Sequence, residues 1–225
     1  MGNPVKYILY LIFTVLSMSV LIYYLANTDL WEMYGYNLGF VVLVASLIYT
    51  FYMFIHELIK PEAPVIVAAE GIEVQNALTE RNFFADVYFK FLFCFSFAVL
   101  VFYVILMLRT NFENFNLFPS DWYYAADLYV NLVLPVYILC ESMMTTRYRH
   151  HHYMADILVL FVLCFAHCAY KVLVRSLYYQ QYKIALPTIA DYIMIFLISL
   201  NGYSLNDFML FRKINPQGDY ALFSV

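Results

Sequence analysis

The chain has 225 residues, of which 64% are hydrophobic and only 12% are charged. This composition excludes a soluble monomer of this size, because soluble domains carry about 25% charged residues. The formal net charge of -4 provides no basic surface, so no nucleic-acid partner is expected.

Six apolar runs follow one another along the chain, separated by short polar clusters. Each has about the length that a helix needs to cross the hydrocarbon core of a bilayer. Helices satisfy their own backbone hydrogen bonds in lipid, so they are the favoured structure for such runs. The sequence therefore predicts an all-α integral membrane bundle of about six transmembrane helices, as one domain over residues 1–225. The predicted helices lie near Lys6–Asn27, Leu38–Ile55, Val87–Leu108, Tyr123–Met143, Ile157–Val174 and Ile184–Leu200.

The fourth run carries three polar side chains that are costly to expose to lipid, namely Asp127, Asn131 and Glu141. Asp127 and Asn131 are four residues apart and share a helical face, and Glu141 follows nearly in phase. Pro135 frees the carbonyl group of Asn131, so we expect a kink there. These three side chains are predicted to point into the bundle and to line a cavity. Hydrogen bonds that merely fix one helix to another explain them equally well.

The fifth run contributes His167, an imidazole near the middle of its helix and a further candidate for the cavity lining. Cys164 and Cys168 lie beside it, but His167 points about 100° away from Cys168 on the helix. No second ligand pair has suitable spacing, so a metal site is not predicted. The sequence also has no phosphate-binding glycine loop and no haem motif, so no cofactor is expected. Lys171 in the fifth run, Asp191 in the sixth run and Asn201 directly after the sixth run are further polar residues of these two helices.

The basic residues predict the orientation in the membrane. With both termini in the cytoplasm, eight Lys and Arg residues fall on the cytoplasmic side and four on the other side. This distribution agrees with the positive-inside rule. The turn His150–His152 then belongs to the cytoplasmic side, where we interpret it as a solvated basic turn. Metal binding by this histidine run is the alternative.

A set of short motifs lies along the chain from Tyr34 onward: Tyr34-Gly35, Leu134-Pro135, Glu141, His151-His152-Tyr153, His167 and Leu205-Asn206-Asp207. Through their spacing the chain resembles the androgen-induced protein family, which includes the androgen-dependent regulator of tissue factor pathway inhibitor. Characterised members are multi-pass threonine hydrolases of fatty-acid esters of hydroxy fatty acids. The resemblance implies membrane lipids and a lipid ester as ligands. It also implies the endoplasmic reticulum or another endomembrane as the location.

The residues that carry catalysis in this family are not matched. The position of the family's nucleophilic threonine is Val42, and that of its histidine is Val130 or Asn131, depending on a one-residue shift. A valine has no nucleophile, and an asparagine cannot take a proton. Ser46 and His167 are replacement candidates, because a buried hydroxyl beside an oriented imidazole could cleave an ester. The alternative role of Ser46 is helix packing.

Two functional hypotheses follow. The first is a lipid-ester hydrolase that is weak or inactive because the family's pair of residues is missing. The second is a non-catalytic membrane protein that binds lipid or serves as a structural subunit of an assembly. A hydroxyl and an imidazole that meet in a lipid-sized cavity would favour the first hypothesis. A cavity that holds only Asn131, Glu141 and apolar walls would exclude catalysis.

Overall fold

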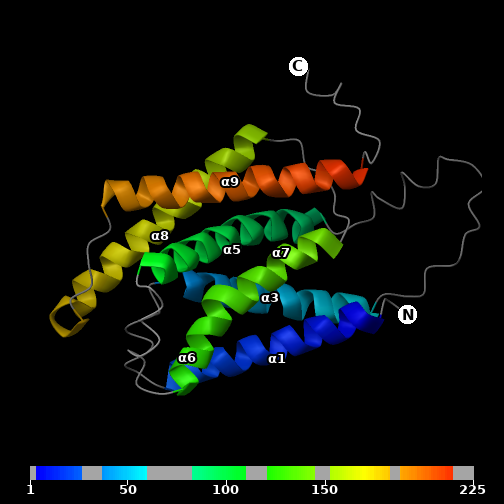
Figure 1. The fold of residues 1–225 in the computed structure, drawn as a ribbon, viewed down its shortest axis with the longest axis horizontal. Coiled ribbons are helices and arrows are strands. Elements are labelled where there is room, and N and C mark those ends of the chain that lie inside the picture. The colour runs from blue at the N-terminus through cyan, green and yellow to red at the C-terminus, as the bar shows by residue number, and fades with distance from the viewer. Residues whose placement is uncertain are drawn as a thin grey trace, which may run out of the picture.

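The computed structural model describes residues 4–26, 37–59, 83–109, 121–144, 153–182 and 188–214, and every described element is helical. Six helical stretches are long and apolar enough to cross a membrane, which confirms the predicted all-α bundle of about six transmembrane helices (Figure 1). The elements in chain order are α1 (Pro4–Ala26), α3 (Leu38–Ile59), α5 (Phe83–Arg109), α6 (Asp121–Leu128), the π-helix η2 (Tyr129–Val133), α7 (Leu134–Met144), α8 (Tyr153–Tyr182) and α9 (Ile189–Ile214).

Helix α5 lies at the centre of the bundle and packs against α3, α7 and α9. Helix α1 packs mainly on α3, and α8 packs mainly on α9, which it crosses at an angle in Figure 1, so α1 and α8 are outer helices of the bundle. Both outer helices expose apolar side chains, among them Val15 on α1 and Phe165 on α8. In a bilayer such faces contact lipid, because hydrocarbon solvates apolar side chains at no cost.

Helix α9 differs most from its predicted range of Ile184–Leu200, because it begins at Ile189 and continues to Ile214. Its start is fixed by a capping box, in which the Thr188 N–H donates to Asp191 Oδ2 at 2.7 Å and the Asp191 N–H donates to Thr188 Oγ1 at 3.2 Å. Several of its polar side chains are hydrogen-bonded to carbonyl groups of the helix itself. For example, Asn201 Nδ2 donates to the Leu197 carbonyl at 2.8 Å.

The fourth span is irregular at the place that Pro135 predicts. The Leu134 N–H donates to the carbonyl of Tyr129, five residues earlier, instead of four as in an α-helix. Pro135 has no N–H to offer to Asn131, so the regular pattern cannot be completed there. The resulting π-turn shifts the preceding side chains around the helix axis, and π-turns of this kind are frequent at functional sites.

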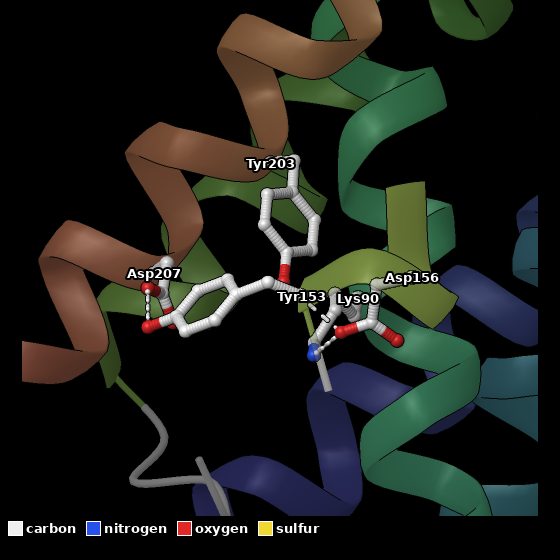
Figure 2. Close-up of polar contacts among 5 residues, drawn as sticks. All are labelled: Lys90, Tyr153, Asp156, Tyr203 and Asp207. Atoms are coloured by element: carbon white, nitrogen blue, oxygen red, sulfur yellow. Dashed lines mark hydrogen bonds and ion pairs between the residues drawn. The ribbon is translucent and has the colours of Figure 1, made fainter. Parts of the chain in front are cut away.

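A buried ion pair joins three helices near the end of the bundle that contains Pro4 and Ile214 (Figure 2). Lys90 Nζ on α5 lies 2.7 Å from Asp156 Oδ2 on α8, and both side chains are less than 10% exposed. The hydroxyl of Tyr203 on α9 donates to the same oxygen at 3.0 Å, and the Lys90 ammonium lies 5.3 Å from the centre of the Tyr203 ring. Beside this cluster, Tyr153 donates to Asp207 Oδ2 at 3.0 Å. The cluster therefore fixes α8 and α9 to the central helix.

Candidate functional site

A cavity of about 490 Å³ lies at the end of the bundle opposite to Pro4 and Ile214. Successive spans run in opposite directions, so the starts of α3, α6 and α9 meet the ends of α5 and α8 at this end (Figure 1). These five helices and η2 together line the cavity. The lining residues are Asn37, Leu38, Gly39, Val99, Phe102, Tyr103, Leu106, Met107, Asp127, Asn131, Lys171, Asp191 and Ile195.

One side of the cavity is polar and is built by the α6–η2 segment. Asn131 Nδ2 donates to Asp127 Oδ1 at 2.8 Å and to the Asp127 carbonyl at 3.1 Å. These bonds fix the amide, and its oxygen faces the backbone of α3 at Gly39. A Cβ atom at Gly39 would lie 2.5 Å from Asn131 Oδ1 and 3.0 Å from a methyl group of Val130. The absence of a side chain at Gly39 therefore lets α3 approach the π-turn.

Lys171 on α8 and Asp191 on α9 add charge to the lining. The two groups are close enough to interact electrostatically. The carboxylate of Asp191 is already engaged, because it accepts hydrogen bonds from both the N–H and the hydroxyl of Thr188. Asp127, Lys171 and Asp191 are therefore the three charged side chains of the lining.

The opposite wall is apolar and comes mainly from α5, with Val99, Phe102, Leu106 and Met107. Leu106 is 48% exposed, so this wall reaches the outer surface of the bundle. Asp127 stands six residues after the start of α6 at Asp121, which places it roughly 9 Å below the helix end at 1.5 Å per residue. The cavity is thus amphipathic and lies inside one end of the bundle.

Of the four residues predicted to line a cavity, Asp127 and Asn131 lie in this lining. Glu141 lies elsewhere, in the packed interior between α1, α3 and α7, and is only 2% exposed. Its Oε1 atom accepts hydrogen bonds from Tyr10 at 2.8 Å and from Tyr49 at 2.6 Å. Glu141 therefore points into the bundle, where it joins three helices.

Ser46 and His167 do not form a catalytic pair in this structure. Ser46 is fully buried on α3, and His167 is 7% exposed on α8, one turn before Lys171. Neither the Ser46 hydroxyl nor either ring nitrogen of His167 has a hydrogen-bond partner in the described part of the chain, so the two do not bond to each other. Helix α8 packs mainly on α9, whereas α3 packs on α1 and α5. Neither residue is part of the cavity lining.

The two positions at which the family resemblance expects threonine and histidine lie on neighbouring elements. Val42 is fully buried on α3, one turn after Gly39, and α3 packs against the π-turn that carries Val130 and Asn131. Gly39 itself would contact both Val130 and Asn131 through any added Cβ atom. A threonine and a histidine at these positions would therefore lie on facing helices beside the cavity.

Sequence reasoning missed Gly39, Tyr103 and the apolar wall of α5 as parts of the site. A glycine near the start of a membrane helix was an available signal, since small residues allow helices to approach closely. The wall of α5 carries no comparable signal, because its residues resemble those of any lipid-facing helix.

Comparisons with known proteins give no match to a family model, to a curated protein or to a solved structure. Across residues 4–26, 37–59, 83–109, 121–144, 153–182 and 188–214, no three His, Cys, Asp or Glu side chains are grouped so that they could hold a metal ion. The turn His150–His152 lies outside these residues. The family resemblance therefore stays a prediction that rests on the motifs alone.

Proposed function

We propose that this chain is a multi-pass membrane protein that binds an amphipathic lipid in the cavity and does not cleave it. The observation that carries the proposal is the division of the lining into a polar side and an apolar wall that reaches the bundle surface. A lipid has the same division between its head and its acyl chain. Ligand cavities in proteins commonly have volumes of about 300–1,000 Å³, and the volume of about 490 Å³ lies within this range.

The polar groups suit an ester or a hydroxylated acyl chain. The ammonium group of Lys171 can donate to a carbonyl or carboxylate oxygen, and the carboxylate of Asp127 can accept from a hydroxyl. Tyr103 can do both. The acyl chain would leave along Leu106 and Met107 toward the surrounding lipid. Fatty-acid esters of hydroxy fatty acids, which the family resemblance implies, combine these groups in one molecule.

Binding without cleavage follows from the residues of the lining. Among the residues that the structure describes, the lining contains no Ser, Thr, Cys or His side chain. Val42 replaces a threonine at little change in size, so the space can persist while the hydroxyl is lost. The structural-subunit hypothesis does not require a cavity, and the hydrolase hypothesis requires Ser46 and His167 to meet. The lipid-binding hypothesis therefore agrees best with the geometry.

The proposal includes an orientation and a location. With both termini in the cytoplasm, the cavity lies on the lumenal side of an endomembrane such as the endoplasmic reticulum. A ligand would reach it from the lumenal leaflet, past the exposed side chain of Leu106.

Photocrosslinking tests the proposal with a matched pair of variants on α5. Leu106 lines the cavity, whereas Ile105 does not, and the two are almost equally exposed at 48% and 49%. The purified protein in lipid nanodiscs would be labelled with a diazirine-bearing fatty-acid ester of a hydroxy fatty acid, and the labelled peptides identified by mass spectrometry. We expect labelling of the α5 segment around Leu106, and competition by the unlabelled ester.

The variant Leu106→Trp should reduce competable labelling about tenfold, because overfilling a site costs roughly 1–3 kcal/mol and 1.4 kcal/mol is a factor of ten. Ile105→Trp should leave it unchanged. Equal labelling of both variants, or labelling confined to the outer faces of α1 and α8, would contradict a specific site.

A further inference from the structure

Helix α9 carries an exposed stripe on the face that is turned away from the bundle. Its members are spaced alternately by three and four residues, which is the repeat of helices that pack side by side in parallel. All of them are exposed in the described part of the chain. We call this set the α9 stripe: Met194, Leu197, Asn201, Ser204 and Phe208.

Asn201 is the unusual member of the α9 stripe. It stands about 18 Å along the span that begins at Ile189, close to the middle of the bilayer. One of its N–H groups donates to the Leu197 carbonyl at 2.8 Å. Its side-chain oxygen and its second N–H have no partner in the described part of the chain. Polar groups at this depth are costly when they face hydrocarbon, so an open donor and an open acceptor indicate a missing hydrogen-bonding partner.

The geometry points to a second copy of this chain as that partner, joined through the α9 stripe. Two copies in one membrane have the same orientation, so a two-fold axis along the membrane normal brings residues of equal depth together. An amide is self-complementary, because its oxygen accepts from the N–H of an identical group while its own N–H donates in return. Asn201 would thus pair with the Asn201 of the second copy. A single asparagine in such a repeat is known to fix the register of paired helices.

The rest of the α9 stripe fits this arrangement. Ser204 lies nearly one turn after Asn201 and is small, so it allows the two helices to approach closely. Met194, Leu197 and Phe208 flank the polar pair with apolar side chains that are 46–49% exposed. The stripe faces away from α5, and the cavity lies on the inner side of α9 at Asp191 and Ile195. Association would therefore leave the cavity accessible.

The test is energy transfer between donor-labelled and acceptor-labelled full-length chains in liposomes, over a series of lipid dilutions. The wild type should give a concentration-dependent signal. Asn201→Leu should weaken association about three- to tenfold, the effect of losing one or two interhelical hydrogen bonds of roughly 0.6 kcal/mol or more. Asn201→Gln should retain most of the association, because the amide group is kept. Val162→Leu on the exposed face of α8 is the control and should have no effect.

Disulfide crosslinking in membranes identifies the partner, with two differently tagged copies expressed together. Ser204→Cys should give an oxidation-dependent band of twice the mass that contains both tags. Leu163→Cys on α8, which carries the same four native cysteines, should not. A band of another mass that lacks the second tag would overturn the proposal in favour of a different membrane protein. A chain that stays monomeric at every dilution, or association unaffected by Asn201→Leu, would also overturn it.

Discussion

At Gly39 the lack of a side chain determines how α3 meets the π-turn. A Cβ atom there would lie 2.5 Å from the Asn131 amide oxygen, which is held by two hydrogen bonds to Asp127. In an ordinary helix, Gly to Ala stabilises by about 1 kcal/mol. Here we expect Gly39→Ala to lower thermal stability and lipid binding, because the amide must move and lose those bonds.

The double variant Gly39→Ala, Asn131→Ala separates this contact from general effects. Removing the amide removes the clashing atom. Gly39→Ala should therefore lower the free energy of unfolding by about 1 kcal/mol less in the Asn131→Ala background than in the wild type, as expected for contacting residues. Thermal unfolding of the four proteins in the same detergent measures the difference. Additive effects would contradict the close contact.

The carboxylate of Glu141 gives a second prediction at the residue scale. Tyr49 donates to it at 2.6 Å inside the bundle, so Tyr49→Phe should lower the free energy of unfolding by about 1 kcal/mol. Tyr52 on the same helix is 37% exposed, and Tyr52→Phe serves as the matched control with no expected loss. Equal melting temperatures for the two variants would show that the Tyr49 hydroxyl contributes nothing.

At the scale of elements, Pro135 maintains the π-turn that orients Asp127 and Asn131. With an alanine at 135, an N–H becomes available to the Asn131 carbonyl, and a regular α-helix becomes possible. We expect Pro135→Ala to weaken lipid binding more than it changes thermal stability, since the preceding side chains would rotate away from the cavity. The neighbouring variant Val136→Ala keeps the proline and should bind normally. Unchanged lipid binding by Pro135→Ala would show that the π-turn is not needed to form the binding site.

The Lys90–Asp156 ion pair, together with Tyr203, connects three helices at the end of the bundle opposite to the cavity (Figure 2). Lys90→Met leaves a buried carboxylate without its cation and should cost about 3 kcal/mol of stability. Adding Asp156→Asn removes the charge but keeps an acceptor for Tyr203, so the double variant should recover most of the loss. Chemical or thermal unfolding measures both steps, and a double variant as unstable as the single one would refute this role.

The sequence predicted those features that depend on one helix at a time. The spacing of Asp127 and Asn131 gave their shared face, and Pro135 gave the irregular turn. Features that depend on packing between helices could not be predicted. Glu141 is in phase with Asp127 along the helix, yet it lies in a different layer of the bundle, where Tyr10 and Tyr49 surround it. The sixth helix was predicted to end at Leu200, whereas α9 continues to Ile214, and several polar residues beyond Leu200 bond to the helix itself or to a neighbouring helix.

For the whole molecule, six spans place Pro4 and Ile214 at the same end of the bundle (Figure 1). Lys6, Lys90, Arg109 and Lys171 lie within the helical spans, and without these four residues the basic residues still favour cytoplasmic termini by six to two. Tags at either terminus should therefore be digested by protease added to intact microsomes. Protection of either tag would contradict this topology.

The most direct test of the central claim, lipid binding without hydrolysis, follows the fate of one isotopically labelled fatty-acid ester of a hydroxy fatty acid. The purified wild-type protein is incubated with it in liposomes, and mass spectrometry quantifies both the intact ester that co-purifies with the protein and the free acid that is released. We expect intact ester on the wild type, strongly reduced ester on Leu106→Trp, and acid release no faster than with the Ser46→Ala, His167→Ala double variant. Acid release by the wild type above that of the double variant, or no retained ester at all, would contradict the account.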